Sequence, residues 1–347
     1  MKKILLFFLL VVSISILYFT KPLISLYFSK DKKEIISQED RIVLTLKKDL
    51  LFEELGTLLI KKKLINNSKN IDGLISYKGF SKEYLKRGKY TFYKSWSTNK
   101  LVNQLYIMRN QNIIDLYIPS SRNLELIVRK INSQLTIDTL KLLDLFKDPV
   151  LAKKYGFTNS NFRTFIIPNT YEVYSSLDEN GIIELIRKEY KKFWNLKRIK
   201  KAKDLGLSQS EVTILASIVQ MEQQIKFDEH SKIAGLYVNR LKRGMKLQAD
   251  PTVKYALNKP NLKRLYYSHL KEDSPYNTYM YKGLPPGPIC IPDSRVIDAV
   301  LNHSKHNYIF MCAEPSYSGY HNFSSTNKEH EKFKKLYTDW LAKEGIR

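Results

Sequence analysis

The sequence predicts an α+β protein that begins with a single transmembrane helix. Three observations support this prediction. Residues 4–20 contain no charged residue, segments typical of strands and of helices alternate between residues 41 and 135, and the second half combines amphipathic helices with a proline-rich loop. An apolar run of this kind approaches the length that crosses a bilayer as a helix, and mixed strands and helices are typical of α+β folds. At 347 residues, the chain has room for two or three domains.

The apolar run between Lys3 and Lys21 predicts an uncleaved membrane anchor with a short cytoplasmic tip over residues 1–30. The run is slightly short for a span, but residues 23–28 extend it and the lysine at its end can snorkel to the interface. Bulky side chains fill the region where a signal peptidase would need small residues. A cleaved signal peptide is the alternative. Both interpretations place most of the chain outside the cytoplasm, and the first predicts a single-pass protein of the cytoplasmic (inner) membrane.

The net charge favours a polyanionic partner. The chain carries 58 Lys and Arg against 34 Asp and Glu, a net charge of +24. This excess suits nucleic acid, anionic lipid, or a wall polymer that bears carboxylates and phosphates, although compositional bias toward Lys, Ile and Asn is an equal explanation. The predicted span argues against nucleic acid. Cys290 and Cys312 could pair in an oxidising compartment or stay free. No His/Cys spacing indicates a metal site, so we expect neither metal nor cofactor.

A polar linker at residues 31–40 precedes a small α+β region at residues 41–110. Within that region the alternating segment RIVLTL at residues 41–46 predicts a strand, and the amphipathic segment at residues 50–65 predicts a helix. Gly88 then turns the chain into a second predicted strand.

Residues 111–160 predict a second small α/β unit. Its strand is expected at residues 113–119 and its helix at residues 124–135, so the order of the first region is repeated as a weak internal duplication. From residue 161 to residue 347 the pattern changes to helices and irregular loops, which predicts a third domain.

Glu222 is the candidate catalytic residue of that third domain. Ser208 and Glu211 fit a capping box, which predicts that a helix begins there. On this helix one face would carry Leu215, Ile218, Glu222 and Ile225, which puts the carboxylate at the end of an apolar stripe. A poorly solvated carboxylate has a raised pKa, which suits a general acid. The alternative is that the helix ends near Met221 and leaves the carboxylate solvated.

Two later segments present polar side chains on turns. Gln248 and Asp250 precede Pro251, where the chain must turn. Residues 274–292 contain five prolines and two glycines, which predicts a rigid, irregular loop. Rigidity lowers the entropy cost of holding a large polar ligand. The candidate ligand-binding residues on this loop are Ser274, Tyr276, Asn277, Thr278 and Tyr279.

Four blocks of the sequence read LASIVQME at residues 215–222, NRLKRGMKLQADPTVKYAL at 239–257, SPYNTYMYKGLPPGPICIP at 274–292 and GYHNFSSTNKEH at 319–330. These blocks resemble the signature blocks of the YceG-like (MltG) family of endolytic murein transglycosylases. Upstream, IIPNTYEVY is similar to the family's FPDTYEV block, and LKRGKYTF is similar to its lysin-motif-like segment. The block order and the anchor agree as well, so the resemblance covers nearly the whole chain.

The resemblance implies a membrane-anchored enzyme that cuts peptidoglycan strands internally, between N-acetylmuramic acid and N-acetylglucosamine. It implies a lysin-motif-like region at residues 41–110 and a YceG-like catalytic domain at residues 161–347, and it places the family's catalytic glutamate on Glu222. Family members often carry a second glutamate where this chain has Gln220. The polymerases and transpeptidases of wall synthesis are the protein partners that the resemblance suggests.

One carboxyl group is enough for the implied chemistry. Protonated Glu222 would donate to the glycosidic oxygen, and the carboxylate would then take the proton of the muramic C6 hydroxyl, which closes on C1 as a 1,6-anhydro end. The candidates for hydrogen bonds to sugar and acyl-amide groups are Asn239, Gln248, Asn277, Thr278 and Tyr279. Asp250 could orient the substrate, stabilise positive charge or only cap a turn. His321 could be a site residue or a turn residue.

Three other functions stay open. A muramidase-type hydrolase would use Glu222 as acid and Asp250 as base, because hydrolysis ordinarily needs two carboxylates, and it would leave reducing ends. A non-catalytic wall-binding or division scaffold would keep its cellular role after Glu222→Gln. A nucleic-acid binder is suggested by charge alone and would need steeply salt-dependent affinity for DNA.

Overall fold

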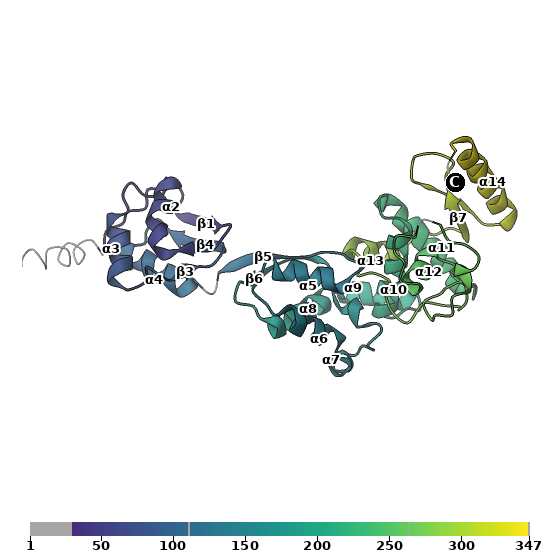
Figure 1. Cartoon of the computed structure of the whole chain (residues 1–347), viewed down its shortest axis with the longest axis horizontal. Coiled ribbons are helices and arrows are strands. Elements are labelled where there is room, and N and C mark those ends of the chain that lie inside the picture. The colour runs from purple at the N-terminus through teal and green to yellow at the C-terminus, as the bar shows by residue number, and fades with distance from the viewer. Residues whose placement is uncertain (1–29, 110–111, 263, 346–347) are drawn as a thin grey trace, which may run out of the picture. The chain divides into compact units, whose positions relative to one another are not determined.

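The computed structural model describes residues 30–109, 112–262 and 264–345 (Figure 1). These residues form two compact units. Unit 1 comprises the described residues up to Leu116 together with Tyr171–Leu177, and unit 2 comprises Tyr117–Thr170 together with the described residues from Asp178 onward. The predicted anchor lies, except for its last residue, outside the described part of the chain. Within that part, no helix is both long enough and apolar enough to span a membrane.

Helices and antiparallel strands build unit 1, as the predicted α+β class requires. In chain order its elements are β1 Arg41–Leu46, β2 Leu50–Leu51, the 3-10 helix η1 Phe52–Glu54, α2 Leu55–Lys61, α3 Lys69–Tyr77, β3 Tyr84–Leu85, β4 Gly88–Tyr93, α4 Thr98–Met108, β5 Ile113–Ile118 and β6 Asn169–Tyr174. The larger sheet has the order β1-β4-β5-β6, and β2 pairs with β3 in a smaller one. The boundary between the two units falls within β5 and β6.

The alternation in β1 sets the core of unit 1. Ile42, Leu44 and Leu46 are buried on one face of the strand, and β1 pairs antiparallel with β4 so that Ile42 lies opposite Phe92. This period-2 burial is the reason that the strand at residues 41–46 was predictable. The helix expected at residues 50–65 is shorter than predicted, because Leu50 and Leu51 pair with β3 before α2 begins.

Unit 2 is mostly helical. Its elements are α5 Leu124–Asn132, α6 Thr139–Lys147, α7 Pro149–Lys154, η2 Phe162–Phe165, α8 Glu179–Phe193, α9 Leu196–Asp204, α10 Gln209–Glu222, η3 Phe227–Glu229, α11 His230–Lys242, α12 Asp250–Ala256, η4 His269–Lys271, α13 Ser294–Leu301, β7 Phe310–Ala313, β8 His321–Ser324 and α14 Asn327–Lys343. Most of these α-helices begin at an Asn, Asp, Ser or Thr whose side chain accepts a hydrogen bond from a backbone N–H of the first turn.

α10 is the central helix of unit 2. The predicted capping box is present, since Glu211 N–H donates to Ser208 Oγ at 3.2 Å and Ser208 N–H donates to Glu211 Oε2 at 2.8 Å. Every residue from Val212 to Val219 is buried. The helix packs against α11, α12 and α13. A helix buried on all sides is hydrophobic on all sides, and this one ends at Glu222.

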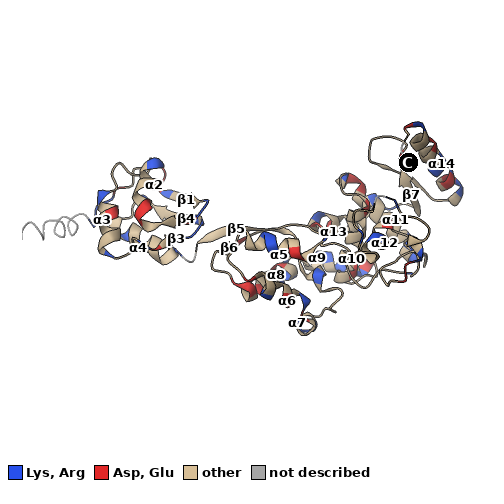
Figure 2. Cartoon of the chain, viewed as in Figure 1, with Lys and Arg blue, Asp and Glu red and all other residues tan. Residues whose placement is uncertain are grey.

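The proline-rich loop and the C-terminal hairpin complete unit 2. The loop is anchored to the segment before α5, because Ser121 and Ile291 exchange backbone hydrogen bonds of 3.2 and 2.8 Å. β7 and β8 form an antiparallel hairpin, and α14 packs against both strands. Cys290 is buried in this unit, and both it and Cys312 are free thiols. Figure 2 shows that Lys and Arg residues are spread over both units rather than gathered on one element.

Candidate active site

The carboxyl group of Glu222 is held where water reaches it poorly. Tyr237, a buried residue of α11, donates its O–H to Glu222 Oε1 at 2.6 Å. Burial raises the pKa of Glu222 to about 7, although the Tyr237 hydrogen bond opposes that rise. The negative charge of Asp250 raises this pKa further, whereas the positive charges of His321 and Lys254 lower it. A carboxyl group with a pKa near 7 can both give and take a proton at neutral pH.

Asp250 lies at the first residue of α12, close enough to Glu222 to affect its ionisation. Its Oδ1 accepts a hydrogen bond of 2.7 Å from the O–H of Tyr279 on the proline-rich loop. Burial raises the pKa of Tyr279, and the neighbouring carboxylate of Asp250 raises it further. Tyr279 therefore stays protonated, and its O–H group donates the hydrogen bond that keeps Asp250 in place.

Glu229 holds His321 near the end of α10. It accepts hydrogen bonds from His321 N–H at 2.9 Å, from His321 Nδ1 at 2.7 Å and from Gln223 Nε2 at 2.9 Å. Burial alone would raise the pKa of Glu229, but the hydrogen bonds from His321 and Gln223 lower it. Glu229 is thus a charged carboxylate that fixes the ring of His321 beside the residue that follows Glu222.

The buried side chain of Arg240 links several segments of the chain near the site. Its guanidinium donates to the carbonyl oxygens of Ile309 at 2.6 Å and Leu247 at 2.8 Å, and to Gln248 Oε1 at 3.2 Å. Burial lowers the pKa of Arg240, while the nearby tyrosines and Glu222 raise it. These hydrogen bonds tie α11 to the start of the hairpin and to the turn before α12.

The structure brings four of the predicted site residues together, namely Glu222, Asp250, Tyr279 and His321. It shows three others in contacts with the backbone. Asn277 donates to the carbonyl oxygens of Leu270 and Glu272, Thr278 Oγ1 accepts from Ala249 N–H, and Asn239 donates to the carbonyl oxygens of His306 and Tyr308. The side-chain amides of Asn277 and Asn239 and the hydroxyl oxygen of Thr278 are thus engaged within the protein, so contact with a ligand stays a prediction for these residues.

The remaining three predicted residues lie around the same loops. Gln248 is exposed and adopts a positive φ of 50° at the turn before α12. Ser274 Oγ accepts a 3.3 Å hydrogen bond from Tyr276 N–H within a turn. The ring of Tyr276 packs against that of Tyr255, with the centroids 4.8 Å apart. Their role in binding stays a prediction as well.

Gly287 is a position in the proline-rich loop that tolerates no side chain. A Cβ there would lie 2.0 Å from Ser160 O and 2.8 Å from Tyr276 Oη. We expect Gly287→Ala to lower the free energy of unfolding by about 2 kcal/mol, because the clash is with backbone that cannot rotate away. Denaturant unfolding of the variant beside the wild type measures this. A change below about 0.5 kcal/mol, the usual size of a surface substitution, would contradict the close approach.

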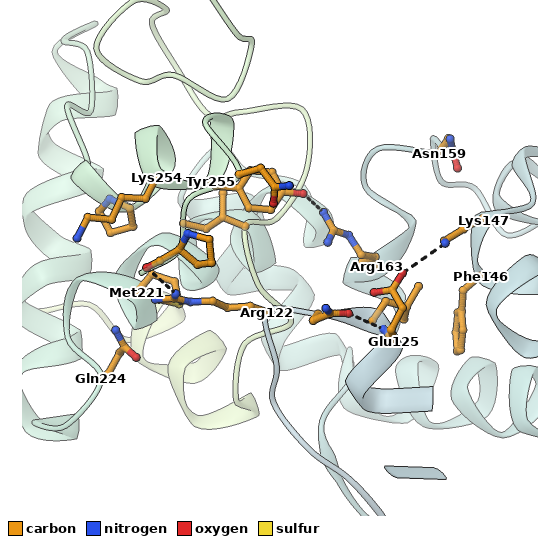
Figure 3. A pocket seen from close by; sticks show the side chains of 16 residues that line it. Arg122, Glu125, Phe146, Lys147, Asn159, Arg163, Met221, Gln224, Lys254 and Tyr255 are labelled. Atoms are coloured by element: carbon orange, nitrogen blue, oxygen red, sulfur yellow. Dashed lines mark hydrogen bonds and ion pairs between the residues drawn. The ribbon is translucent and has the colours of Figure 1, made fainter. Parts of the chain in front are cut away.

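Unit 2 contains a cavity of about 740 Å³ whose lining includes residues of α10 and α12 but neither Glu222 nor Asp250 (Figure 3). Met221 and Gln224, which lie on either side of Glu222 along the chain, form part of its wall. Pro251 and Lys254 of α12 form another part. Arg122 and Arg163 enter it from other segments, as Figure 3 shows.

Sequence reasoning missed several of these residues. Tyr237 and Arg240 lie on α11, and nothing in the spacing of that segment marks them as site residues. Glu229 lies in the polar turn after α10 and acquires its role only through Gln223 and His321, the latter from β8. A tyrosine or arginine at an otherwise apolar position of a helix is the sequence signal that could have indicated Tyr237 and Arg240. Such a polar group needs a hydrogen-bond partner once it is buried.

Three comparisons identify relatives. Residues 44–335 match the model of the YceG-like family. Over 131 residues the chain is 41% identical to an endolytic murein transglycosylase of Bacillus subtilis, which covers 38% of this chain and 35% of that protein. Over 309 residues it is 26% identical to an endolytic murein transglycosylase of Streptococcus pneumoniae, which covers 81% of this chain and 55% of that protein. The chain thus spans about half or less of the length of these curated relatives.

A solved structure agrees. The crystal structure of a putative YceG-like protein from Listeria monocytogenes is 26% identical to the chain, with a TM-score of 0.55, and the match covers 84% of this chain and 98% of that one. Because the family model matches residues 44–335, which is well over half of the sequence, the chain belongs to the YceG-like family.

Proposed function

We propose that the chain is an endolytic lytic transglycosylase of peptidoglycan, in which Glu222 is the single general acid and base. The observation that carries the proposal is the environment of Glu222, where burial raises the pKa of the carboxyl group to about 7 and Tyr237 fixes its orientation. Two relatives that are named endolytic murein transglycosylases support the choice of substrate.

The reaction begins with protonated Glu222. It gives its proton to the glycosidic oxygen as the bond to muramic C1 breaks, which leaves an oxocarbenium-like centre. In this mechanism the carboxylate of Asp250 stabilises that positive charge. Its hydrogen bond from Tyr279 and its effect on the pKa of Glu222 support this role. The Glu222 carboxylate then takes the proton of the muramic C6 hydroxyl, and the C6 oxygen bonds to C1. An internal hydroxyl needs no bound water, so a second catalytic carboxylate is not required.

The proposal includes a location. The uncharged run at residues 4–20 supports an anchor in the cytoplasmic membrane, with unit 2 outside the cytoplasm where peptidoglycan lies. Protease added to spheroplasts should then degrade unit 2. Protection of unit 2 in intact spheroplasts would overturn this topology. Contact with the polymerases and transpeptidases of wall synthesis is proposed from the family resemblance alone.

Product analysis tests the function. The full-length chain in detergent is incubated with uncrosslinked glycan strands, and the fragments are weighed by mass spectrometry. Fragments with 1,6-anhydro ends are expected. Reducing ends, which carry one added water, would instead assign a muramidase-type hydrolase with Asp250 as its base. Binding without cleavage would favour a wall-binding scaffold.

The rate of cleavage should depend on pH through Glu222. The acid must be protonated at the first step, so kcat/KM is expected to fall as the pH rises above about 7. Tyr237→Phe removes a hydrogen bond that stabilises the carboxylate, which raises the pKa of Glu222. We therefore expect the alkaline limb of kcat/KM to move up by about one pH unit in this variant.

Tyr267→Phe is the matched control, because Tyr267 is exposed on the loop after α12. It should leave the pH profile unchanged. A Tyr237→Phe profile that coincides with the wild type would show that this hydrogen bond does not tune Glu222.

A further inference from the structure

The cavity next to Glu222 is a built feature of unit 2 rather than a surface depression of one element. Its lining residues come from the N-terminal turn of α5, the end of α6, η2, the end of α10 and α12. Met221 and Pro251, the chain neighbours of Glu222 and Asp250, lie in its wall. Glu222 and Asp250 do not line the cavity themselves, but Lys254, which does, is close enough to Glu222 to affect its ionisation.

The cavity carries three cations that have no carboxylate partner among the described residues, namely Arg122, Arg163 and Lys254. Arg122 donates to Met221 Sδ at 3.2 Å and to Pro260 O at 3.3 Å. These partners are neutral, so they leave its charge uncompensated.

The hydrogen-bond partners of Arg163 are neutral as well. Arg163 donates to Pro288 O at 3.0 Å and to the hydroxyl of Tyr255, and neither partner is charged. Among the described lining residues, Glu125 is the only acidic one, and Lys147 pairs with it at 3.4 Å (Figure 3). Arg122, Arg163 and Lys254 therefore give the cavity lining a net positive charge, which favours an anionic ligand.

We propose that this cavity binds the carboxylates of the peptide branch that the muramic acid residue carries at the cleavage point. This inference rests on the proposed function. The branch leaves the sugar at C3 through a lactyl group, two ring carbons from the C1 at which the bond breaks, so it lies within reach of a cavity that adjoins Glu222. The free ends and acidic side chains of such peptides are carboxylates.

The chemistry of the lining fits this ligand. Planar guanidinium groups bind carboxylates through two parallel hydrogen bonds, and Arg122 and Arg163 supply two of them from separate segments. Phe146 and Ile289, also in the lining, provide apolar surface for the aliphatic parts of a peptide.

The direct test measures strand binding by a variant that cannot cleave the strand. The full-length Glu222→Gln chain in detergent is titrated with short glycan strands whose peptides carry free carboxylates, and with the same strands after amidation of those carboxylates. In this background the influence of Lys254 on the ionisation of Glu222 no longer matters. We expect the free-carboxylate strands to bind about tenfold more tightly.

Charge removal locates the effect. Adding Arg122→Gln and Lys254→Gln should weaken binding of the free-carboxylate strands about tenfold and leave binding of the amidated strands within about twofold. Lys200→Gln on α9 is the control. It removes one exposed positive charge outside the cavity and should preserve the preference.

Three results would overturn the inference. The first is equal affinity for both kinds of strand. The second is an equal loss of affinity for both kinds of strand when Arg122 and Lys254 are replaced. The third is that inorganic pyrophosphate displaces the strands more strongly than a free peptide with the same carboxylates does. The last result would assign the cavity to a phosphate. If the wild type cuts neither kind of strand but the binding preference is present, the proposed function fails and the peptide subsite stands.

Discussion

Replacing Glu222 with glutamine is expected to slow strand cleavage by about a thousandfold, the usual contribution of a positioned general acid and base. Glutamine has the same size, and its Oε1 can still accept the hydrogen bond that Tyr237 donates to the native carboxylate. It cannot give a proton to the glycosidic oxygen. Chromatography of released fragments at a pH below 7 measures the loss, since the native acid is then protonated.

A matched variant separates this loss from a general effect of removing a carboxylate. Glu331 is exposed on α14 and pairs with Lys334 at 3.1 Å, so Glu331→Gln should leave the rate unchanged. If Glu222→Gln kept more than about a tenth of the activity, Glu222 would not be the acid. A cellular phenotype that Glu222→Gln complements fully would support the scaffold function instead.

Local patterns predicted the parts of this fold that local physics decides. The alternation in RIVLTL gave β1 because a strand with one buried face must alternate, and Ile42 and Leu44 lie on that face. Ser208 and Glu211 gave the start of α10 because the capping box satisfies two backbone N–H groups. The same spacing continued the helical face to Ile225, which was wrong: the helix ends at Glu222, close to the end near Met221 that the alternative expected, and Ile225 is exposed.

The surroundings of Glu222 were not predictable in this way. Tyr237, Asp250 and His321 come from three different elements. Packing of α10 against α11 and α12 brings the first two to one carboxyl group, and hydrogen bonds to Glu229 hold His321 near it. Asn277 was predicted to contact the ligand because it is a polar residue in a rigid loop. The structure shows its amide bound to the carbonyl oxygens of Leu270 and Glu272, so contact with a ligand stays a prediction. A polar residue in a rigid loop is needed as often to satisfy the loop as to contact a ligand.

The ionised carboxylate of Glu222 should also destabilise the folded protein at high pH. We expect Glu222→Gln to raise the free energy of unfolding at pH 8 by about 3 kcal/mol and to leave it nearly unchanged at pH 4. The folded-state pKa of Glu222 is raised to about 7 from an ordinary value of 4.5, so the folded protein binds this proton more tightly than the unfolded chain does. The stability gained from that proton is complete below pH 4.5 and is lost as the pH rises to about 7. Glutamine does not ionise and avoids the loss.

Hydrogen exchange of the α10 amides at pH 4, 6 and 8 can follow this difference, because those amides open only when the core of unit 2 opens. Glu229→Gln serves as the control of opposite sign. Hydrogen bonds from His321 and Gln223 lower the pKa of Glu229, so its charged form stabilises the fold and its replacement should reduce stability at pH 8. Equal stability of wild type and Glu222→Gln at pH 8 would mean that the Glu222 carboxylate is well solvated. A measured gain would instead show a charge that the fold disfavours, which is what a buried general acid requires.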